Sequence, residues 1–194
     1  MIGMAAVEAP WGPIHLAVDA DGLIGLEVLT TEGAFAATVA RRAGEPPSSH
    51  PLPAVRRRLD AAVEATEAHL AGRPDAFAFI PASLAGFSAW DRLVLDGVRR
   101  IPWGEVTSYG RLARAIGRPG AARAAGGAIG RNPIGLAIPC HRVIAGDGSI
   151  GSYGGSWFGD RDALVGIKRT LLALEGSDPL GGAVTWTTFG DRRG

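Results

Sequence analysis

The chain has 194 residues, 46% of them hydrophobic and 20% charged, which suits one large domain or two small ones with a buried core. No apolar run approaches the ~20 residues of a membrane span, and we expect neither a secretory signal nor a membrane partner. The only cysteine, Cys140, excludes an internal disulfide and favours a reducing cytoplasm. Scattered histidines and the lack of a Cys-x-x-Cys spacing predict that the chain binds no metal.

The charge is unevenly distributed, although its formal net value is only +1. Residues 1–86 hold 6 basic and 10 acidic residues, whereas residues 87–194 hold 14 basic and 9 acidic residues. Nineteen of the 20 basic residues are arginine, and eight of these lie between positions 99 and 142 beside a single acid, Glu105. This clustering fits either a solvated surface in an arginine-rich chain or a patch that faces phosphates.

Residues 1–86 are expected to form a small α/β domain with an antiparallel sheet. Ile14, Leu16 and Val18 alternate with other residues, and the turn-forming stretch 19–22 separates them from a second apolar run, as in a β-hairpin. The pattern further predicts helices over 31–43 and 53–70, which end at Gly44 and Gly72, and allows a short strand at 77–80. No catalytic constellation is visible in this part of the chain.

Residues 87–194 are expected to form a second, mainly helical domain. Ser88 with Asp91 predicts a capped first helix. A second helix is expected over 108–116, and a third from Pro119 to Gly130. Two short helices joined by a Gly/Pro turn predict a helix-turn-helix.

The third of these helices carries almost no side-chain bulk, because it consists mainly of alanine and glycine. Arg123 is its one long projection. Small residues allow either tight packing against other helices or a close approach to a DNA groove. Each interior glycine costs about 1 kcal/mol relative to alanine, so a compensating contact is expected.

The run IPCHRV (138–143) sets Cys140 between Pro139 and His141. A single cysteine is most often an inert buried residue. Here Pro139 fixes the backbone before the thiol, His141 is an adjacent base, and the charge of Arg142 is expected to favour the thiolate. A turn or a bridging water would be needed to bring His141 to the sulfur, because neighbouring side chains on an extended chain point apart.

IPCHRV resembles the active-site signature of the O6-alkylguanine-DNA alkyltransferases, also called methylated-DNA–protein-cysteine methyltransferases. The resemblance extends over 104–176, through GEVTSYGRLARAIGRPGAARAAGGAIGRNP, GSYGG and IKRTLLALEG. It implies an α/β fold, with a small α/β domain over 1–86 and a mainly helical domain with a winged helix-turn-helix over 87–194.

The resemblance also assigns catalytic roles. It implies that Cys140 is the nucleophile, that His141 is its base through a water, and that Glu175 orients His141. It further implies that Asn132 holds the active-site turn and that Tyr109 lies by the flipped nucleotide. From the residues alone, Tyr109 could be a packed aromatic, Glu175 a surface charge and Asn132 a plain turn residue.

The resemblance implies base and DNA contacts as well. Arg123 would enter the base stack where the guanine left, or it could be a plain surface charge. Val143, Tyr153 and Gly154 would wall the pocket. At Gly154 many relatives have serine, and the stretch 156–166, with its two aromatic residues, is longer than the usual link.

The implied function is irreversible transfer of an alkyl group from O6-alkylguanine, and also from O4-alkylthymine, in double-stranded DNA to Cys140. The thioether product resists water and there is no second cysteine, so each molecule should act once. We expect a cytoplasmic, nucleoid-associated monomer that uses no cofactor. The alternatives are a sensor of alkylated DNA without catalysis, a thiol hydrolase and a transcription factor with an incidental cysteine.

Overall fold

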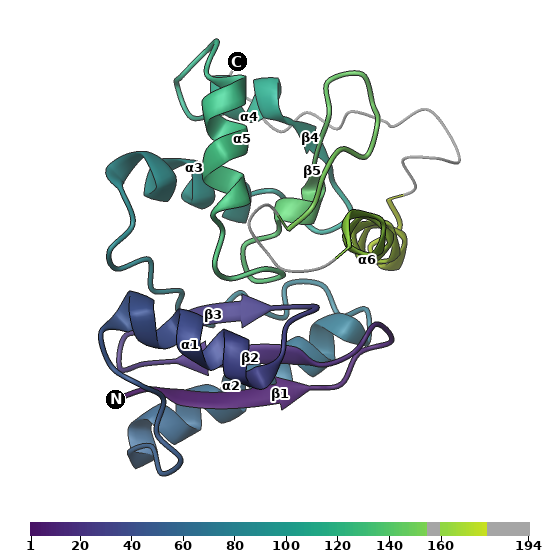
Figure 1. The fold of residues 1–194 in the computed structure, drawn as a ribbon. Helices are drawn as coiled ribbons and strands as arrows, with labels where there is room; N and C mark the ends of the chain where they lie inside the picture. The colour runs from purple at the N-terminus through teal and green to yellow at the C-terminus, as the bar shows by residue number, and fades with distance from the viewer. Residues whose placement is uncertain (155–159, 178–194) are drawn as a thin grey trace. The chain divides into compact units, whose positions relative to one another are not determined.

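The computed structural model describes residues 1–154 and 160–177, which form two compact units. The N-terminal unit comprises residues 1–86 and also takes in residues 133–137, and the C-terminal unit comprises the other described residues. Each unit has its own sheet and its own helices (Figure 1). No helix within the described ranges is long and apolar enough to cross a membrane.

The N-terminal unit contains a three-stranded antiparallel sheet of order β1-β2-β3 and two helices. The predicted hairpin is confirmed as β2 and β3, and the backbone amides of Asp21 and Gly22 donate to Asp19 Oδ1 in its turn, at 2.8 and 3.0 Å. Strand β1 was not predicted. The elements are β1 (Gly3–Val7), β2 (Ile14–Val18), β3 (Leu23–Glu27), α1 (Glu32–Ala43) and α2 (Pro53–Leu70).

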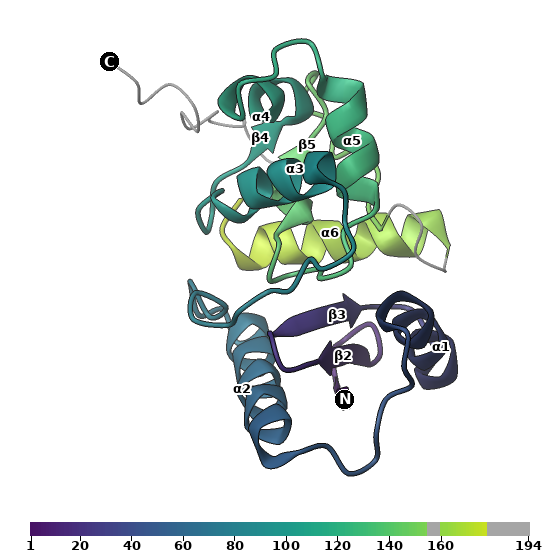
Figure 2. The same ribbon diagram turned by 90° about the vertical axis from the view of Figure 1, so that its left-hand side faces the viewer.

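The two helices cover opposite faces of this sheet (Figure 2). On one face His15 of β2 stacks on Phe35 of α1, with 5.7 Å between the ring centroids. On the other face Gly3 of β1 lies against Val55 and Leu59 of α2. All five residues of β2 are therefore buried, although alternation is typical of a strand with one exposed face.

The ends of the predicted helices follow from local chemistry. Helix α1 ends at Gly44, whose φ of 78° favours glycine and whose N–H donates to Ala40 O at 2.9 Å. The short strand allowed at 77–80 is wrong. These residues form turns instead, in which the N–H of Ile80 donates to Phe77 O at 3.1 Å.

The C-terminal unit is mainly helical. Ser88 caps α3 as predicted, since its Oγ accepts from Asp91 N at 3.1 Å and donates to the Asp91 carboxylate at 2.8 Å. Pro119 precedes the third predicted helix instead of starting it. The elements are α3 (Ala89–Arg99), β4 (Thr107–Ser108), α4 (Tyr109–Ala115), α5 (Ala122–Gly130), the 3₁₀ turn η1 (Cys140–Arg142), β5 (Val143–Ile144) and α6 (Arg161–Leu174).

Helices α3, α4 and α5 pack against one another. A Cβ on Gly97 of α3 would lie 2.6 Å from Ile116 Cγ2, so glycine is required for this close approach. In α5, Ala125 and Ala128 are buried, whereas Arg123 is exposed. The small residues of α5 thus serve helix packing on one side and leave the other side open.

The two-stranded parallel sheet of β4 and β5 places Tyr109 and the turn η1 next to its strands. Thr107 pairs with Val143, and Ser108 pairs with Ile144. Tyr109 therefore follows the end of β4, while η1 immediately precedes the start of β5. Helix α6 packs against these strands through a hydrophobic core of Val106, Ile144, Ile150 and Leu172.

Candidate active site

Cys140 is a free, buried thiol that is only 6% exposed. It begins η1, in which Arg142 N donates to Pro139 O at 2.9 Å. The backbone here is a 3₁₀ turn and not an extended chain. A turn, one of the two conditions for bringing His141 to the sulfur, is therefore present.

Asn132 closes the loop that delivers the cysteine. It lies just after α5, is 2% exposed, and donates from Nδ2 to Ile138 O at 2.8 Å. Its side chain also hydrogen-bonds the sulfur of Cys140. One amide side chain thus fixes both the backbone before the thiol and the thiol itself.

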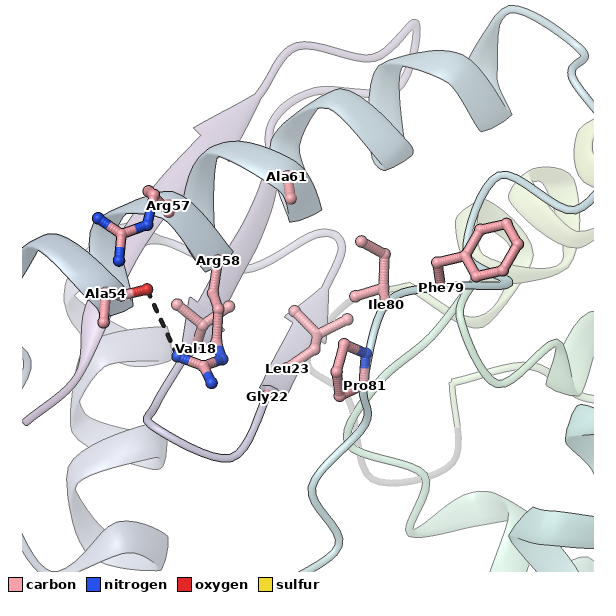
Figure 3. A pocket seen from close by; sticks show the side chains of 10 residues that line it. All are labelled: Val18, Gly22, Leu23, Ala54, Arg57, Arg58, Ala61, Phe79, Ile80 and Pro81. Atoms are coloured by element: carbon pink, nitrogen blue, oxygen red, sulfur yellow. Dashed lines mark hydrogen bonds between the residues drawn. The ribbon is translucent and has the colours of Figure 1, made fainter.

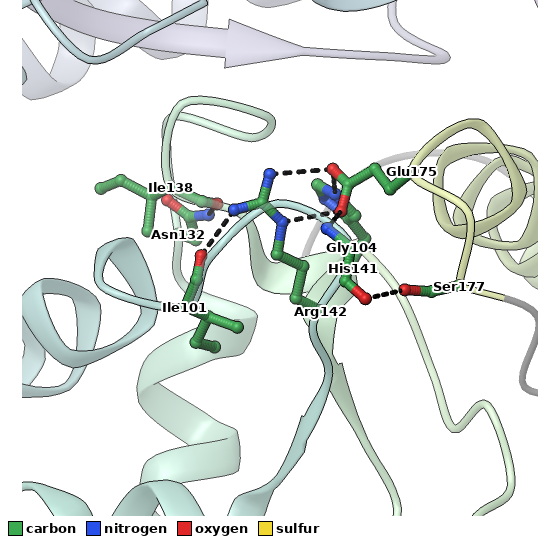
Figure 4. Close-up of polar contacts among 8 residues, drawn as sticks. All are labelled: Ile101, Gly104, Asn132, Ile138, His141, Arg142, Glu175 and Ser177. Carbon is green, nitrogen blue, oxygen red and sulfur yellow. Dashed lines mark hydrogen bonds and ion pairs between the residues drawn. The ribbon is translucent and has the colours of Figure 1, made fainter. Parts of the chain in front are cut away.

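His141, Arg142 and Glu175 form one buried network (Figure 4). Glu175 Oε1 lies 2.8 Å from His141 Nε2, and its two oxygens accept from Arg142 Nη2 at 2.9 Å and from Nε at 2.8 Å. Arg142 Nη1 also donates to Ile101 O at 2.6 Å. Glu175 directly follows α6, so this helix carries the carboxylate to the turn that holds His141.

The network fixes the charge states of its members. Burial alone would raise the pKa of Glu175, but hydrogen bonds from His141 and Arg142 outweigh it and lower this pKa to about 2. Burial lowers the pKa of His141 despite the adjacent carboxylate. At neutral pH the pair is therefore an ionised Glu175 beside a neutral imidazole, which is the form able to accept a proton.

The thiol itself is protonated at rest. Burial raises the pKa of Cys140, and a hydrogen bond from Asn132, the charge of Lys168 and the neighbouring Tyr153 only partly offset this. We expected the favourable charge to come from Arg142, which was wrong. Arg142 directs its donors to Glu175 and Ile101, and the cation that lowers the pKa of Cys140 is Lys168.

Tyr109 lies close to the cysteine. It begins α4, and a Cβ on Gly126 of α5 would lie 3.6 Å from its ring. Burial raises the pKa of Tyr109, the Cys140 charge raises it further, and a hydrogen bond with Ser152 opposes both. The Tyr109 ring therefore lies beside Gly126 of α5, at a distance that would also accommodate a Cβ.

Val143, Tyr153 and Gly154 occupy the segments around the thiol. Val143 is fully buried in β5, and burial together with the nearby charge of Cys140 raises the pKa of the buried Tyr153. Gly154 has a φ of 74°, a conformation that favours glycine.

Among the described residues, no contact joins Arg123 to this cluster. It is exposed on α5, one turn before Gly126, the glycine that adjoins Tyr109. Residues three apart share a helix face, so Arg123 lies on the side of α5 that passes Tyr109.

A separate pocket of about 470 Å³ lies within the N-terminal unit (Figure 3). Arg57 and Arg58 of α2 line it together with apolar side chains that include Leu23 and Ile80. Among its lining residues there is no cysteine, histidine or carboxylate, so it offers no group for alkyl transfer.

Comparisons with known proteins identify the family. Residues 89–177 match the family model of the 6-O-methylguanine DNA methyltransferase DNA-binding domain. The methylated-DNA–protein-cysteine methyltransferase of Mycobacterium tuberculosis is 36% identical over 91% of this chain and 94% of its own length. The chain belongs to this family.

Other methyltransferases agree with this assignment. The Mycolicibacterium paratuberculosis member is 46% identical over 61% of this chain and 66% of its own length. The crystal structure of Mycobacterium tuberculosis O6-methylguanine methyltransferase superposes with a TM-score of 0.65, at 32% identity over 90% of this chain and 93% of its own. That of Mycobacterium tuberculosis OGT in complex with DNA gives 0.65, at 30% identity over 89% and 92%.

Family membership confirms the predicted activity and the mixed α/β fold. The chain is a DNA-binding methyltransferase that repairs DNA by direct reversal, through transfer of an alkyl group to a cysteine of the protein itself. Cys140 is the only cysteine it contains.

Two residues of the methyltransferase site were not predicted from the sequence in the roles that the structure gives them. The ion pair of Arg142 with Glu175 was not expected, and Lys168 was assigned no role. The signal for Lys168 was present in the composition, because it is the only lysine in the chain.

The long link was also partly misread. Residues 161–166 of that stretch belong to α6 and not to a loop. Trp157 and Phe158, the two aromatic residues of that stretch, fall outside the described residues.

Proposed function

We propose that Cys140 is the acceptor of the alkyl group from O6-alkylguanine, and from O4-alkylthymine, in double-stranded DNA. The observation that carries this is the position of a buried thiol at the start of a 3₁₀ turn, beside a neutral His141 that Glu175 holds. Each molecule acts once, since a thioether is not hydrolysed as a thioester is and no other cysteine can take the group.

The proton leaves the thiol through the His141 relay. Nε2 of His141 faces the ionised Glu175 and therefore carries the imidazole proton, so Nδ1 is the nitrogen that accepts the proton from Cys140 by way of a water. The sulfur then attacks the alkyl carbon, a C–S bond forms, and the C–O6 bond breaks with its electron pair on O6. The guanine takes up a proton as it leaves.

We further propose that Tyr109 acts at the flipped nucleotide. Tyr109 lies near enough to Cys140 for the charge of Cys140 to affect the pKa of its hydroxyl. A base that presents O6 to the sulfur would therefore lie beside the phenol. A donor at that place stabilises the negative charge that develops on the leaving guanine. Val143, Tyr153 and Gly154 line the pocket that receives the base.

A winged helix-turn-helix built on α4 and α5 presents this site to duplex DNA. Because the target atom lies inside the stack, the nucleotide must be flipped out at a cost of a few kcal/mol. The exposed side of α5 has little bulk, which permits close approach to a groove, and Arg123 fills the gap that the base leaves.

Further features remain predictions. They are the division into domains over 1–86 and 87–194, a monomeric state, a cytoplasmic and nucleoid-associated location and independence of any cofactor.

Intact-mass measurement tests the proposal directly. The protein is incubated under reducing conditions with a duplex oligonucleotide that contains one O6-methylguanine. We expect a single CH2 adduct on Cys140 in the wild type and none in Cys140→Ala. Binding without an adduct would identify a sensor, and turnover of acyl substrates would identify a hydrolase; either result excludes the proposal.

A further inference from the structure

Lys168 is the only lysine among the 20 basic residues of the chain, and its position in the fold is unusual. It lies in α6 and has no solvent exposure. Lysine is among the residues least often fully buried, because an ammonium loses its hydration. The other 19 basic residues of the chain are all arginine, so the one lysine stands at this buried position.

The contacts of Lys168 tie together two segments around the thiol. Its Nζ donates to Val143 O at 2.7 Å and to Ser152 O at 3.2 Å. Val143 follows η1 directly, and Ser152 precedes Tyr153. A single ammonium therefore joins the strand after the cysteine to the segment that carries Tyr153 and Gly154.

Lys168 also acts electrostatically on the reacting groups. Its charge lowers the pKa of Cys140 and that of His141. Burial lowers the pKa of Lys168 to about 8, and the charge of Cys140 opposes this, so the ammonium is protonated at neutral pH. Tyr109, Tyr153, Glu175 and Arg142 also interact electrostatically with this cysteine–histidine pair.

The residue type fits such a role. Lysine presents a compact point charge with three donors, whereas arginine presents a planar fork suited to carboxylates. Two backbone carbonyls satisfy two of the three donors of Lys168 without neutralising its charge. Arg142, in contrast, is bound to the Glu175 carboxylate through two of its nitrogens.

We propose that Lys168 is a positioning residue of the alkyl-transfer site, whose ammonium stabilises the Cys140 thiolate as it forms and holds the Val143 and Ser152 segments together. The proton of the thiol still goes to His141, and Lys168 keeps its own proton throughout. The inference rests on the proposed role of Cys140 as the alkyl acceptor.

The first test compares Lys168→Met with a matched control on the same helix, Leu172→Ala, which loosens the core beneath β5 without removing a charge. The single-turnover rate constant with the free base O6-benzylguanine is measured against pH. Lys168→Met should be about tenfold slower at pH 7, the factor expected when one neighbouring charge is lost, and the gap should close as the pH rises. Leu172→Ala should be less stable but keep the pH profile of the wild type.

A charge-retaining variant and a measurement on the wild type keep the test decisive if Lys168→Met does not fold. Lys168→Arg should recover part of the rate at pH 7. With 15N-labelled lysine, the untagged protein gives one Nζ resonance, because it has one lysine. The pKa read from this resonance should be about 8, below the usual 10.5, so that Nζ is still protonated at pH 7.

An unchanged pH profile in folded Lys168→Met, or an Nζ that is already deprotonated at pH 7, would overturn the role of Lys168. Such a failure is distinct from failure of the proposed function. In the first case the wild type still takes up the alkyl group on Cys140, and in the second it does not.

Discussion

Replacement of Glu175 by glutamine should weaken both the fold and the relay, because this carboxylate is the shared acceptor of His141 and Arg142. The glutamine side chain would keep the shape of the glutamate but lose its charge and present an amide donor to a guanidinium or to the imidazole N–H. Arg142 would then be a buried cation without a carboxylate partner.

The expected loss can be estimated in two ways. A shift of the Glu175 pKa from 4.5 to about 2 corresponds to about 3 kcal/mol of stability at neutral pH. Removal of one partner from a buried ion pair costs about 3–5 kcal/mol in other proteins. The two values agree, so we expect Glu175→Gln to lose about 3 kcal/mol at pH 7.

The pH dependence gives this prediction its sign. Because folding lowers the pKa of Glu175, its contribution is present in full above the unfolded value of 4.5 and is lost as the pH falls toward 2. The difference between wild type and variant should therefore shrink to about 1.5 kcal/mol at pH 3.

Urea denaturation at pH 7 and pH 3 measures both differences. Glu64→Gln is a matched control, because it makes the same change at an exposed position of α2. Equal stability of Glu175→Gln and wild type at pH 7, or a loss that is as large at pH 3 as at pH 7, would refute the reasoning.

Two further outcomes follow from the same site. Arg123→Ala should slow repair of duplex DNA far more than reaction with free O6-benzylguanine. Arg118→Ala, which removes another exposed arginine, should not show this difference. Equal losses of Arg123→Ala on both substrates would contradict the proposed role of Arg123 in the base stack. Because burial lowers the pKa of His141, the single-turnover rate should not fall on its acid side until the pH is below 6.5, and a midpoint above 6.5 would contradict the neutral-base assignment.

Features that depend on neighbouring residues could be predicted from the sequence alone. The turn after Val18, the cap at Ser88 and the helix stop at Gly44 arise from contacts within a few positions, so their residue types suffice to predict them. The motif around Cys140 likewise identified the family before any geometry was known.

The burial of both faces of β2 could not be predicted from the sequence. Strand β2 shows an alternating pattern, yet α1 and α2 cover its two faces, and these helices come later in the chain. The short strand at 77–80 failed for a related reason, because a strand needs a partner and these residues bond locally in turns.

The site shows the same division. The motif indicated Cys140, His141 and Glu175 as site residues. Which of them pair, and which charge acts on the thiol, depends on the tertiary structure. Glu175 is 34 positions from His141 and Lys168 is 28 positions from Cys140, so their pairing depends on where α6 packs against η1. Arg142, two positions after the thiol in sequence, is paired with Glu175, whereas the distant Lys168 supplies the positive charge at Cys140. Burial and hydrogen bonding decide which charge acts on the thiol, and sequence separation does not.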